Sequence, residues 1–327
     1  MLDILKLIAV TQPTGATVHQ ENDFSILLEP KLRKVFFETY DEVPEQYSQI
    51  FNVLSSTKAQ EFDYHLGAMG EWNELGTPMS TVANGTDMPS IEYSKIHAGN
   101  QVIYTHHEFA RGFMVERKFM DDEQYGVIEK FTADLSRAGR YKVENDAFAV
   151  LNNAFTNVGY DGKALIAEDH PLIDSPKTVS NRIYSTTFDS ATIQKALTLG
   201  RNQLDNAGKK VQMKFDTIVV PPALEWKAYE ILNSALKAGT NNNDKNVLSG
   251  ILNVKVVDFL TSDTAWFLMD SKRHQLNFFW RVKPEFGREK DFDTLVSKYS
   301  GYMRYSAGYS DFRGVIGCDG VSTDPTP

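Results

Sequence analysis

The chain has 327 residues, of which 42% are hydrophobic, and its 34 basic and 43 acidic side chains leave a net charge of −9. This length allows one large core or two ordinary ones. The acidic balance argues against nucleic-acid binding as the main activity, since such proteins carry a basic face. We expect the single cysteine, Cys318, to be a small buried residue rather than a nucleophile. No segment approaches the ~20 apolar residues of a transmembrane helix.

Residues 1–56 are short amphipathic pieces broken by prolines, with helical spacing over Lys31–Tyr40. They predict an arm laid over other protein. In residues 57–118, Gly, Pro and Asn crowd the middle and alternating patterns lie on both sides, which predicts a long β-hairpin. Because a two-stranded hairpin is marginally stable alone in water, we expect it to be mobile in a free subunit and fixed on a partner.

The next segment, residues 121–157, lacks proline and predicts one long helix. At 1.5 Å per residue it would measure about 55 Å, whereas ordinary helices average about 11–12 residues. Such a rod needs an extended surface to cover its apolar side. The residues predicted for that side are Ile128, Phe131, Leu135, Ala138, Tyr141, Phe148, Leu151 and Phe155.

Residues 188–280 read as a small α/β domain. Asp189 can cap a helix, and the β-branched run Thr217–Val220 predicts a strand buried on both faces. A helix is predicted over Ala223–Ala238, followed by an Asn/Gly loop and three strands, Leu252–Phe259, Ala265–Met269 and Leu276–Val282. The chain alternates again through residues 281–320, and residues 321–327 predict a disordered tail.

The sequence lacks the motifs of phosphate-binding loops, dinucleotide sites, zinc proteases and serine hydrolases. We therefore expect no enzymatic activity, no cofactor and no metal site. His106–Glu108 could suggest a metal site, but adjacent strand residues point to opposite faces. Asp169 and His170, near Asp161, could form an acid–base pair, although a turn built by these residues is the simpler interpretation.

Two further groups of charges have plain structural interpretations. Asp121–Glu123 could hold a cation, but carboxylates at a helix start also favour the positive end of the helix dipole. Four arginines near the end of the chain could bind an anion. Interspersed acidic residues favour ion pairs within or between subunits instead; the arginines are Arg281, Arg288, Arg304 and Arg313.

The order of several segments resembles the major head subunits of Mu-like tailed phages, over about residues 60–320. The resemblance is carried by Glu116–Gly126, the long helix, Tyr160–Lys163, Asp169–Pro171, Trp266–Asp270, Arg281–Pro284 and Arg304–Gly308. Ala164–Ile166 departs from the pattern, where bulkier aromatic residues are expected after the Asp-Gly turn. The departure concerns local packing.

The resemblance implies an α+β fold of the Hong Kong 97 capsid type. Its parts would be an N-terminal arm (1–56), an extended loop (57–118), a peripheral domain with spine helix 121–157 (119–187, with the return 281–320) and an axial domain (188–280). By the same analogy, the loop Gly239–Asn246 would lie near the centre of a capsomer.

The function implied is that of a major capsid protein. Identical subunits would form pentamers and hexamers of an icosahedral head, enclosing double-stranded DNA without sequence-specific binding and without a membrane. Assembly in the host bacterial cytoplasm would involve a scaffold or protease, a portal and a decoration protein, and the chain would end in the virion. Lys58 and Lys95 are available for cross-linking to a neighbour's asparagine, and the net charge predicts a wall that repels DNA, which a basic inner face would contradict.

Three alternatives remain open. The shell of an encapsulin-like nanocompartment would share the fold and enclose a cargo enzyme. A soluble hydrolase or metal enzyme would use Asp161, Asp169 and His170. A tail or portal component fits the order of segments less well.

Overall fold

A computed structural model describes residues 21–68, 97–122, 125–234, 236, 245–291 and 293–321. These residues form two compact units. Unit 1 contains the described residues of Met1–Val43, Arg111–Ala138 and Phe286–Gly301, and unit 2 those of Pro44–Ala110, Gly139–Glu285 and Tyr302–Pro327. The first twenty residues of the predicted arm, Lys95, Glu123, most of the 239–246 loop and the tail after Val321 lie outside the described residues.

Unit 1 is built from α1 (Glu21–Glu42), α2 (Arg117–Asp121) and the first part of α3 (Tyr125–Asn152). Strands β4 (His107–Glu116), β11 (Leu276–Asp291) and β12 (Val296–Tyr309) also contribute residues to it. Its core consists of Leu32, Phe36, Val115, Ile128, Phe286 and Tyr299.

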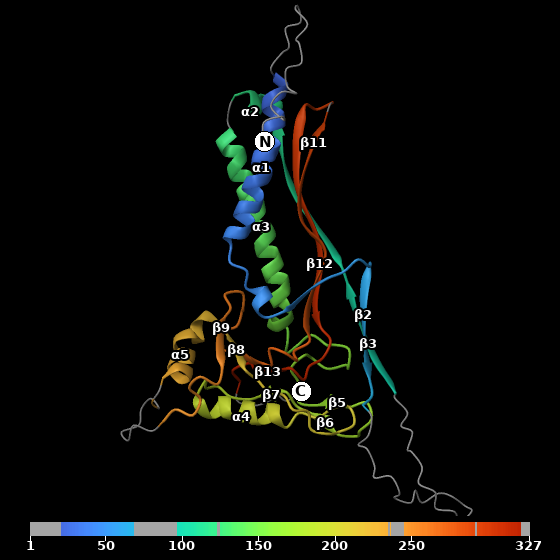
Figure 1. Cartoon of the computed structure of the whole chain (residues 1–327), viewed down its shortest axis with the longest axis vertical. Coiled ribbons are helices and arrows are strands. Elements are labelled where there is room, and N and C mark those ends of the chain that lie inside the picture. The colour runs from blue at the N-terminus through green and yellow to red at the C-terminus, as the bar shows by residue number, and fades with distance from the viewer. Residues whose placement is uncertain are drawn as a thin grey trace, which may run out of the picture. The chain divides into compact units, whose positions relative to one another are not determined.

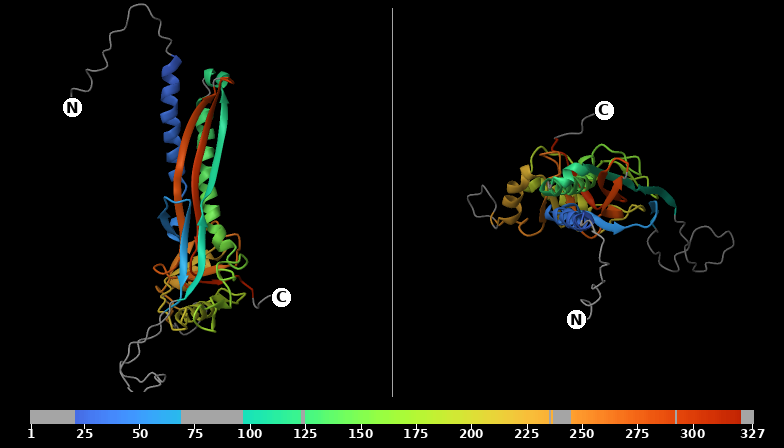
Figure 2. Two further views of the ribbon diagram at one scale, coloured as in Figure 1. Left: turned by 90° about the vertical axis from the view of Figure 1, so that its right-hand side faces the viewer. Right: turned by 90° about the horizontal axis from the view of Figure 1, so that it is seen from above.

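Helix α1 lies alongside the first part of α3 (Figures 1 and 2). Lys31 forms an ion pair with Glu129, and the Ser136 hydroxyl donates a 2.6 Å hydrogen bond to the carbonyl of Phe36. The helix predicted over Lys31–Tyr40 is therefore present but longer, because α1 continues through Pro30.

Unit 2 contains a five-stranded mixed sheet in the order β7-β13-β10-β8-β9. Central β10 runs antiparallel to β8 and β13, and the outer pairs, β13 with β7 and β8 with β9, are parallel. All four residues of β8 are buried, which confirms the strand predicted there. The strands are β7 (Arg182–Ile183), β8 (Thr217–Val220), β9 (Asn253–Val256), β10 (Trp266–Met269) and β13 (Val315–Cys318).

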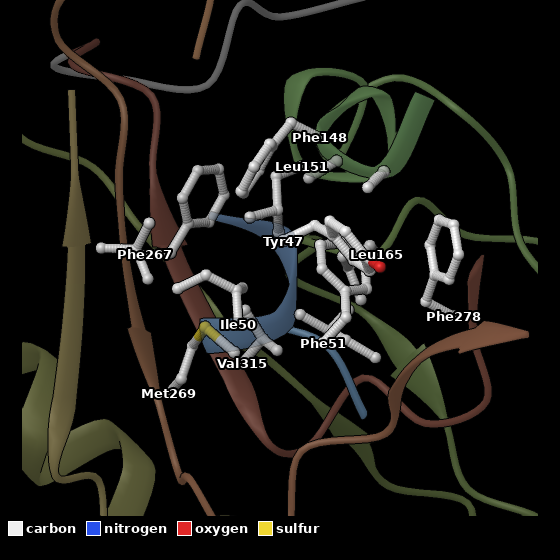
Figure 3. Packing of buried hydrophobic residues seen from close by; sticks show 14 of the residues in the cluster. Tyr47, Ile50, Phe51, Phe148, Leu151, Leu165, Phe267, Met269, Phe278 and Val315 are labelled. Carbon is white, nitrogen blue, oxygen red and sulfur yellow. The ribbon is translucent and has the colours of Figure 1, made fainter. Parts of the chain in front are cut away.

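Both faces of this sheet are covered, and neighbouring strand residues point into different clusters. Ile218 packs with residues of α4 (Ser190–Arg201) and α5 (Glu225–Asn233), whereas Val219 belongs to the opposite cluster. That second cluster joins Phe148 and Leu151 of α3 to the segment Tyr47–Phe51, which includes the short helix η1 (Tyr47–Gln49); Figure 3 shows these side chains together. Successive residues of β8 point to opposite faces and both faces are covered, so every position of this strand is buried.

The remaining strands form three smaller groups. Strand β1 (Asn52–Ser55) runs parallel to the start of β11 in a four-stranded sheet ordered β1-β11-β12-β4. A two-stranded antiparallel hairpin pairs β2 (Gln60–Leu66) with β3 (Ala98–Thr105). The pair β5 (His170–Pro171) and β6 (Thr178–Val179) is short, and η2 (Pro222–Leu224) precedes α5.

Several elements differ from the predicted bounds. Helix α3 begins at Tyr125 rather than Asp121, because Arg117–Asp121 form the separate helix α2. It ends at Asn152, whose side-chain amide bonds the backbone of Phe259 and Thr261 and so joins the helix end to another segment. Helix α5 ends at Asn233, because Ser234 is extended. Strand β11 continues to Asp291, and β13 joins the five-stranded sheet although we assigned residues 281–320 to the peripheral domain.

The buried side of α3 also differs from the predicted apolar side. Phe131 and Tyr141 are 47% and 48% exposed. The residues buried instead include a polar line at four-residue intervals: Thr132, Ser136, Arg140 and Glu144. Each of these four side chains forms a hydrogen bond, so α3 buries polar groups as well as apolar ones.

Candidate functional site

The β2–β3 hairpin has one face turned to solvent, and that face is apolar. Phe62 pairs with Ile103 across the strands, and Tyr64 and Leu66 follow on the same face of β2, since alternate strand residues share a face. Their exposed fractions are 46% for Phe62, 53% for Ile103, 63% for Tyr64 and 56% for Leu66. We call these four residues the apolar face. A soluble monomer rarely exposes such a contiguous group without a partner.

The opposite face of the hairpin is attached to its own unit. Tyr104 is 4% exposed, and its hydroxyl lies 2.7 Å from that of Ser310, while burial raises its pKa. The His65 ring stacks on Tyr160 at 3.9 Å, and the Asn100 amide donates to the Tyr160 carbonyl at 2.7 Å. The expectation that the hairpin is fixed on a partner rather than on its own unit is therefore wrong for residues 60–66 and 98–105.

A buried histidine holds the base of the hairpin. The two ring nitrogens of His106 lie 2.9 Å from the Ser306 hydroxyl and 3.0 Å from the Ser56 hydroxyl. Ser56 also donates a 2.8 Å hydrogen bond to Glu61, whose pKa this bond lowers. Burial, helped by Arg304, lowers the pKa of His106 and favours the neutral ring.

His106 lies between β3 and β4 and is buried, whereas His107, the first residue of β4, is exposed, so the adjacent imidazoles point apart as predicted. Glu108 is exposed like His107, so the three residues do not alternate. The two imidazoles therefore do not converge on one ion. In the parts of the chain that the structure describes, no group of three His, Cys, Asp or Glu side chains is arranged to hold a metal.

The second sequence candidate is a buried cluster around His170. Its Nδ1 lies 2.5 Å from Asp161 Oδ2, its Nε2 lies 3.2 Å from Asn181 Oδ1, and its ring stacks on Phe312 at 3.7 Å. Asp169 is not the partner, because its carboxylate forms an ion pair with Lys163 at the surface. The sequence therefore identified the imidazole but left its carboxylate open, and the structure selects Asp161.

Asn181 completes this cluster and was missed from sequence. Its amide nitrogen donates to the carbonyls of Leu165, Phe312 and Val315, and its oxygen accepts from the Ala167 amide. The side chain is fully buried. Its neighbours in sequence are polar loop residues, which gave no signal of a buried hub.

A hollow of about 270 Å³ borders this cluster, lined by Asp161, Asn206 and Arg313 together with hairpin residues such as His65. His170 does not line it and its side chain is 1% exposed. Arg313 is engaged by Asp311, by Asn206 at 2.5 Å and by the Leu204 carbonyl. Arg313, the cation that lines the hollow, is therefore hydrogen-bonded to neighbouring groups of the protein.

The four arginines do not form one anion site. Arg304 pairs with Glu108 at 3.5 Å and Arg313 with Asp311 at 2.9 Å, as the ion-pair interpretation predicts. Arg288 lies over the Tyr299 ring in unit 1, and Arg281 belongs to unit 2. Of the charges predicted at the start of the long helix, Asp122 follows the end of α2, ahead of α3, and is exposed.

Two single residues singled out from the sequence are also placed. Cys318 is buried in the sheet and burial raises its pKa, which confirms the structural interpretation. Lys58 forms a 3.0 Å ion pair with Glu61 at the base of the hairpin. Among the described helices, none is long and apolar enough to cross a membrane.

Solved structures of phage capsids share this arrangement. The capsid of bacteriophage JBD30 aligns over 67% of this chain and 92% of its own, with a TM-score of 0.54 and 17% identity. The mature capsid of bacteriophage PhiM1 gives a TM-score of 0.51 with 11% identity, covering 85% and 86%. Mycobacterium phage Cain gives 0.50 with 13% identity, covering 86% and 91%. The fold is therefore the Hong Kong 97-type capsid fold.

Comparison of the amino-acid sequence with known families also points to phage capsid proteins. Residues 99–317 match the family described as phage capsid protein, and the chain belongs to that family. The Mu-like prophage FluMu major head subunit of Haemophilus influenzae is 25% identical over 162 residues, which are 49% of this chain. The match spans 47% of that relative, about half of its length.

Proposed function

We propose that this chain is a major capsid protein that self-assembles into pentamers and hexamers of an icosahedral phage head enclosing double-stranded DNA. The observation that carries this proposal, beside family membership, is the apolar face of the hairpin. One side of β2 and β3 is anchored to unit 2, while Phe62, Tyr64, Leu66 and Ile103 face outward without cover in the described chain. A neighbouring subunit would cover them.

The energetics favour many modest contacts over one strong contact. Burying the exposed half of four such side chains contributes about 1 kcal/mol each, or about 4 kcal/mol per copy before ordering costs. Closed symmetry repeats this contact in every subunit, so a weak pairwise affinity produces a stable shell. The role is structural rather than catalytic, because no step in this assembly needs bond chemistry.

The segments are assigned in keeping with this role. Residues 1–56 form the arm, 57–118 the extended loop, 119–187 and 281–320 the peripheral domain, and 188–280 the axial domain, with the 239–246 loop near the capsomer centre. The sharing of β13 with the axial sheet supports a peripheral return that ends before Val315. Lys58 or Lys95 of the extended loop would be the cross-linking lysine if shells are covalently joined.

The partners are those that head assembly requires: a scaffold or protease, a portal and a decoration protein. A decoration protein is supported by the JBD30 capsid, which is decorated with minor capsid protein trimers and shares 17% identity at a TM-score of 0.54. Assembly takes place in the host bacterial cytoplasm and the protein remains in the virion. The DNA is enclosed without sequence-specific binding.

The nanocompartment alternative is distinguished by cargo. Shells purified from infected or induced cells should contain DNA, whereas a nanocompartment would contain protein. The hydrolase alternative is disfavoured by the buried His170, which stacks on Phe312 and lies outside the neighbouring hollow.

A paired substitution tests the assembly surface. Phe62→Ser with Ile103→Ser removes one cross-strand apolar pair, and the control Gln60→Ser with Thr105→Ser changes an exposed polar cross-strand pair of the same strands. We expect the control to form shells in electron micrographs, and the apolar variant to remain as small species with unchanged circular dichroism. Shells of normal yield from the Phe62/Ile103 variant would contradict the proposed contact.

A further inference from the structure

A group of cations lies on unit 2 at the end of α4, in the loop before β8 and in the turn between β10 and β11. All five are exposed, and none has an ion-pair partner within the described part of the chain. They are Arg201, Lys210, Lys214, Lys272 and Arg273, which we call the basic patch.

Hydrogen bonds show that these three segments adjoin. The Lys210 ammonium donates to Asn202 Oδ1 at 3.1 Å, next to Arg201. The Arg273 guanidinium donates to the Gln212 carbonyl at 2.6 Å and so joins the β10–β11 turn to the loop.

Asp270 supplies the second link between the loop and the turn. Its carboxylate accepts from the backbone N–H of Lys214 at 2.9 Å and from that of Lys272 at 3.1 Å. The buried Asp270 carboxylate therefore holds the backbone of both lysines. These bonds place the three segments that carry the five cations next to one another.

The carboxylates nearby accept hydrogen bonds from backbone and hydroxyl groups, and in the described chain none forms an ion pair with these five cations. Asp205 accepts from the backbone N–H groups of Ala207 and Lys209. Asp216 accepts from the backbone and hydroxyl of Ser271, and these bonds lower its pKa. Five exposed cations outnumber the carboxylates of Asp205, Asp216 and Asp270 in the same segments, so the patch is locally positive on a chain of net charge −9. Charges beyond a Debye length of about 10 Å at 0.1 M salt contribute little to this local field.

The surroundings fit nucleic acid better than another protein. Within 201–216 and 270–275, all of them described residues, no large hydrophobic side chain is exposed. Protein interfaces have an apolar core, whereas protein–DNA interfaces are more polar and more positive. The exposed Asn202 and Gln212 amides add groups of the kind that contact phosphate oxygens.

We propose that the basic patch contacts the phosphates of double-stranded DNA, without reading its sequence. This inference rests on the proposed function, in which the shell encloses DNA. The patch would face the interior, and the wall would hold DNA at discrete cationic points within an otherwise repelling surface.

The test compares two triple variants of the full-length, unassembled chain. Lys210→Gln/Lys214→Gln/Lys272→Gln removes three patch charges. The control, Lys34→Gln/Lys130→Gln/Arg137→Gln, removes three exposed charges of α1 and α3. Anisotropy of a labelled 30-base-pair duplex of mixed sequence is followed from 25 to 200 mM salt. Shell formation by each protein is recorded separately by electron microscopy.

Five phosphate contacts predict a slope of log K against log salt of about −4.5. Removing three of them should reduce the magnitude of the slope by about 2.7. The control should keep the wild-type slope. Equal slopes in both variants, or no duplex binding by the wild type, would overturn the proposal. So would a patch variant that binds DNA normally but forms no shells, because the patch would then contact protein. Failure of the wild type to form shells would instead count against the proposed function.

Discussion

Replacing Asn181 with alanine should strongly destabilise unit 2. The side chain makes five hydrogen bonds, to Leu165, Ala167, His170, Phe312 and Val315, at distances between 2.8 and 3.3 Å. All of these partners come from segments that the chain brings together only in the folded state. Alanine would remove these bonds from the Leu165 and Val315 carbonyls, the Ala167 amide and His170 Nε2, whereas the Phe312 carbonyl would keep its bond from the Val315 amide.

The magnitude follows from these contacts. A typical intramolecular hydrogen bond contributes about 0.5–1.5 kcal/mol net, and an unsatisfied buried group costs about 1–3 kcal/mol. A water molecule in the vacated volume can recover part of the loss, because the site is polar. We therefore expect Asn181→Ala to lower the free energy of unfolding by about 3–5 kcal/mol. That is a large part of the about 5–15 kcal/mol of a typical domain.

Urea unfolding of the unassembled chain measures this change. The buried Trp266 and Trp280 report it by fluorescence. With a slope of about 3 kcal/mol/M, the midpoint should fall by about 1 M or more. The control Asn153→Ala removes an exposed amide from the turn that follows α3 and should stay within about 0.5 kcal/mol. A loss for Asn181→Ala of the same size as the control would refute the hub interpretation.

Two further results are expected in the same assay. Gly200→Ala should lower the free energy of unfolding by about 1–3 kcal/mol, because the added Cβ would lie 2.3 Å from the Phe215 ring. Gly126→Ala, whose Cβ meets open space, should raise it, and a change of the same sign in both variants would contradict the packing. Burial lowers the pKa of His106 and His274 below their ordinary 6.5, so the unfolded chain binds more protons and stability should fall as the pH drops through 6.5. His106→Gln/His274→Gln should flatten that fall by up to about 1.4 kcal/mol per pH unit for each histidine, and an unchanged slope would exclude them as its source.

Elements that follow from a local sequence pattern were predictable. The run Thr217–Val220 is a strand because four consecutive buried positions need apolar, β-branched residues on both faces. The opposite burial of His106 and His107 was also predicted, although His106 lies just before β4. The order of segments, read through the resemblance to phage head subunits, led to the correct fold.

Residues whose partners are distant in sequence were not predictable. Glu144 receives hydrogen bonds from residues 97 and 98 positions away, and Ser136 bonds Phe36 at a separation of 100. An apolar periodicity therefore selected Phe131 and Tyr141, which are about half exposed. The buried line of α3 is polar, and no local pattern distinguishes such a line from a solvated one.

The candidate site was partly predictable for the same reason. His170 was recognised, but its carboxylate is Asp161, nine residues away, and not the adjacent Asp169. A net charge averages over the whole surface, so it concealed the basic patch. The hairpin was predicted in outline, whereas its attachment through Tyr104 depends on Ser310, 206 residues later.

The buried carboxylate of Glu144 sets the register between α3 and the segment that leads into β1. It accepts from the backbone N–H groups of Gln46 and Tyr47, and Arg140, one turn earlier, pairs with Glu45 at 3.2 Å. Apolar packing alone tolerates sliding, but these directional contacts do not. A slip of one helical turn, about 5.4 Å, would leave the buried Glu144 carboxylate without its hydrogen-bond donors. This segment is therefore held at one height along α3, and in the proposed shell all copies would present the same shape to their neighbours.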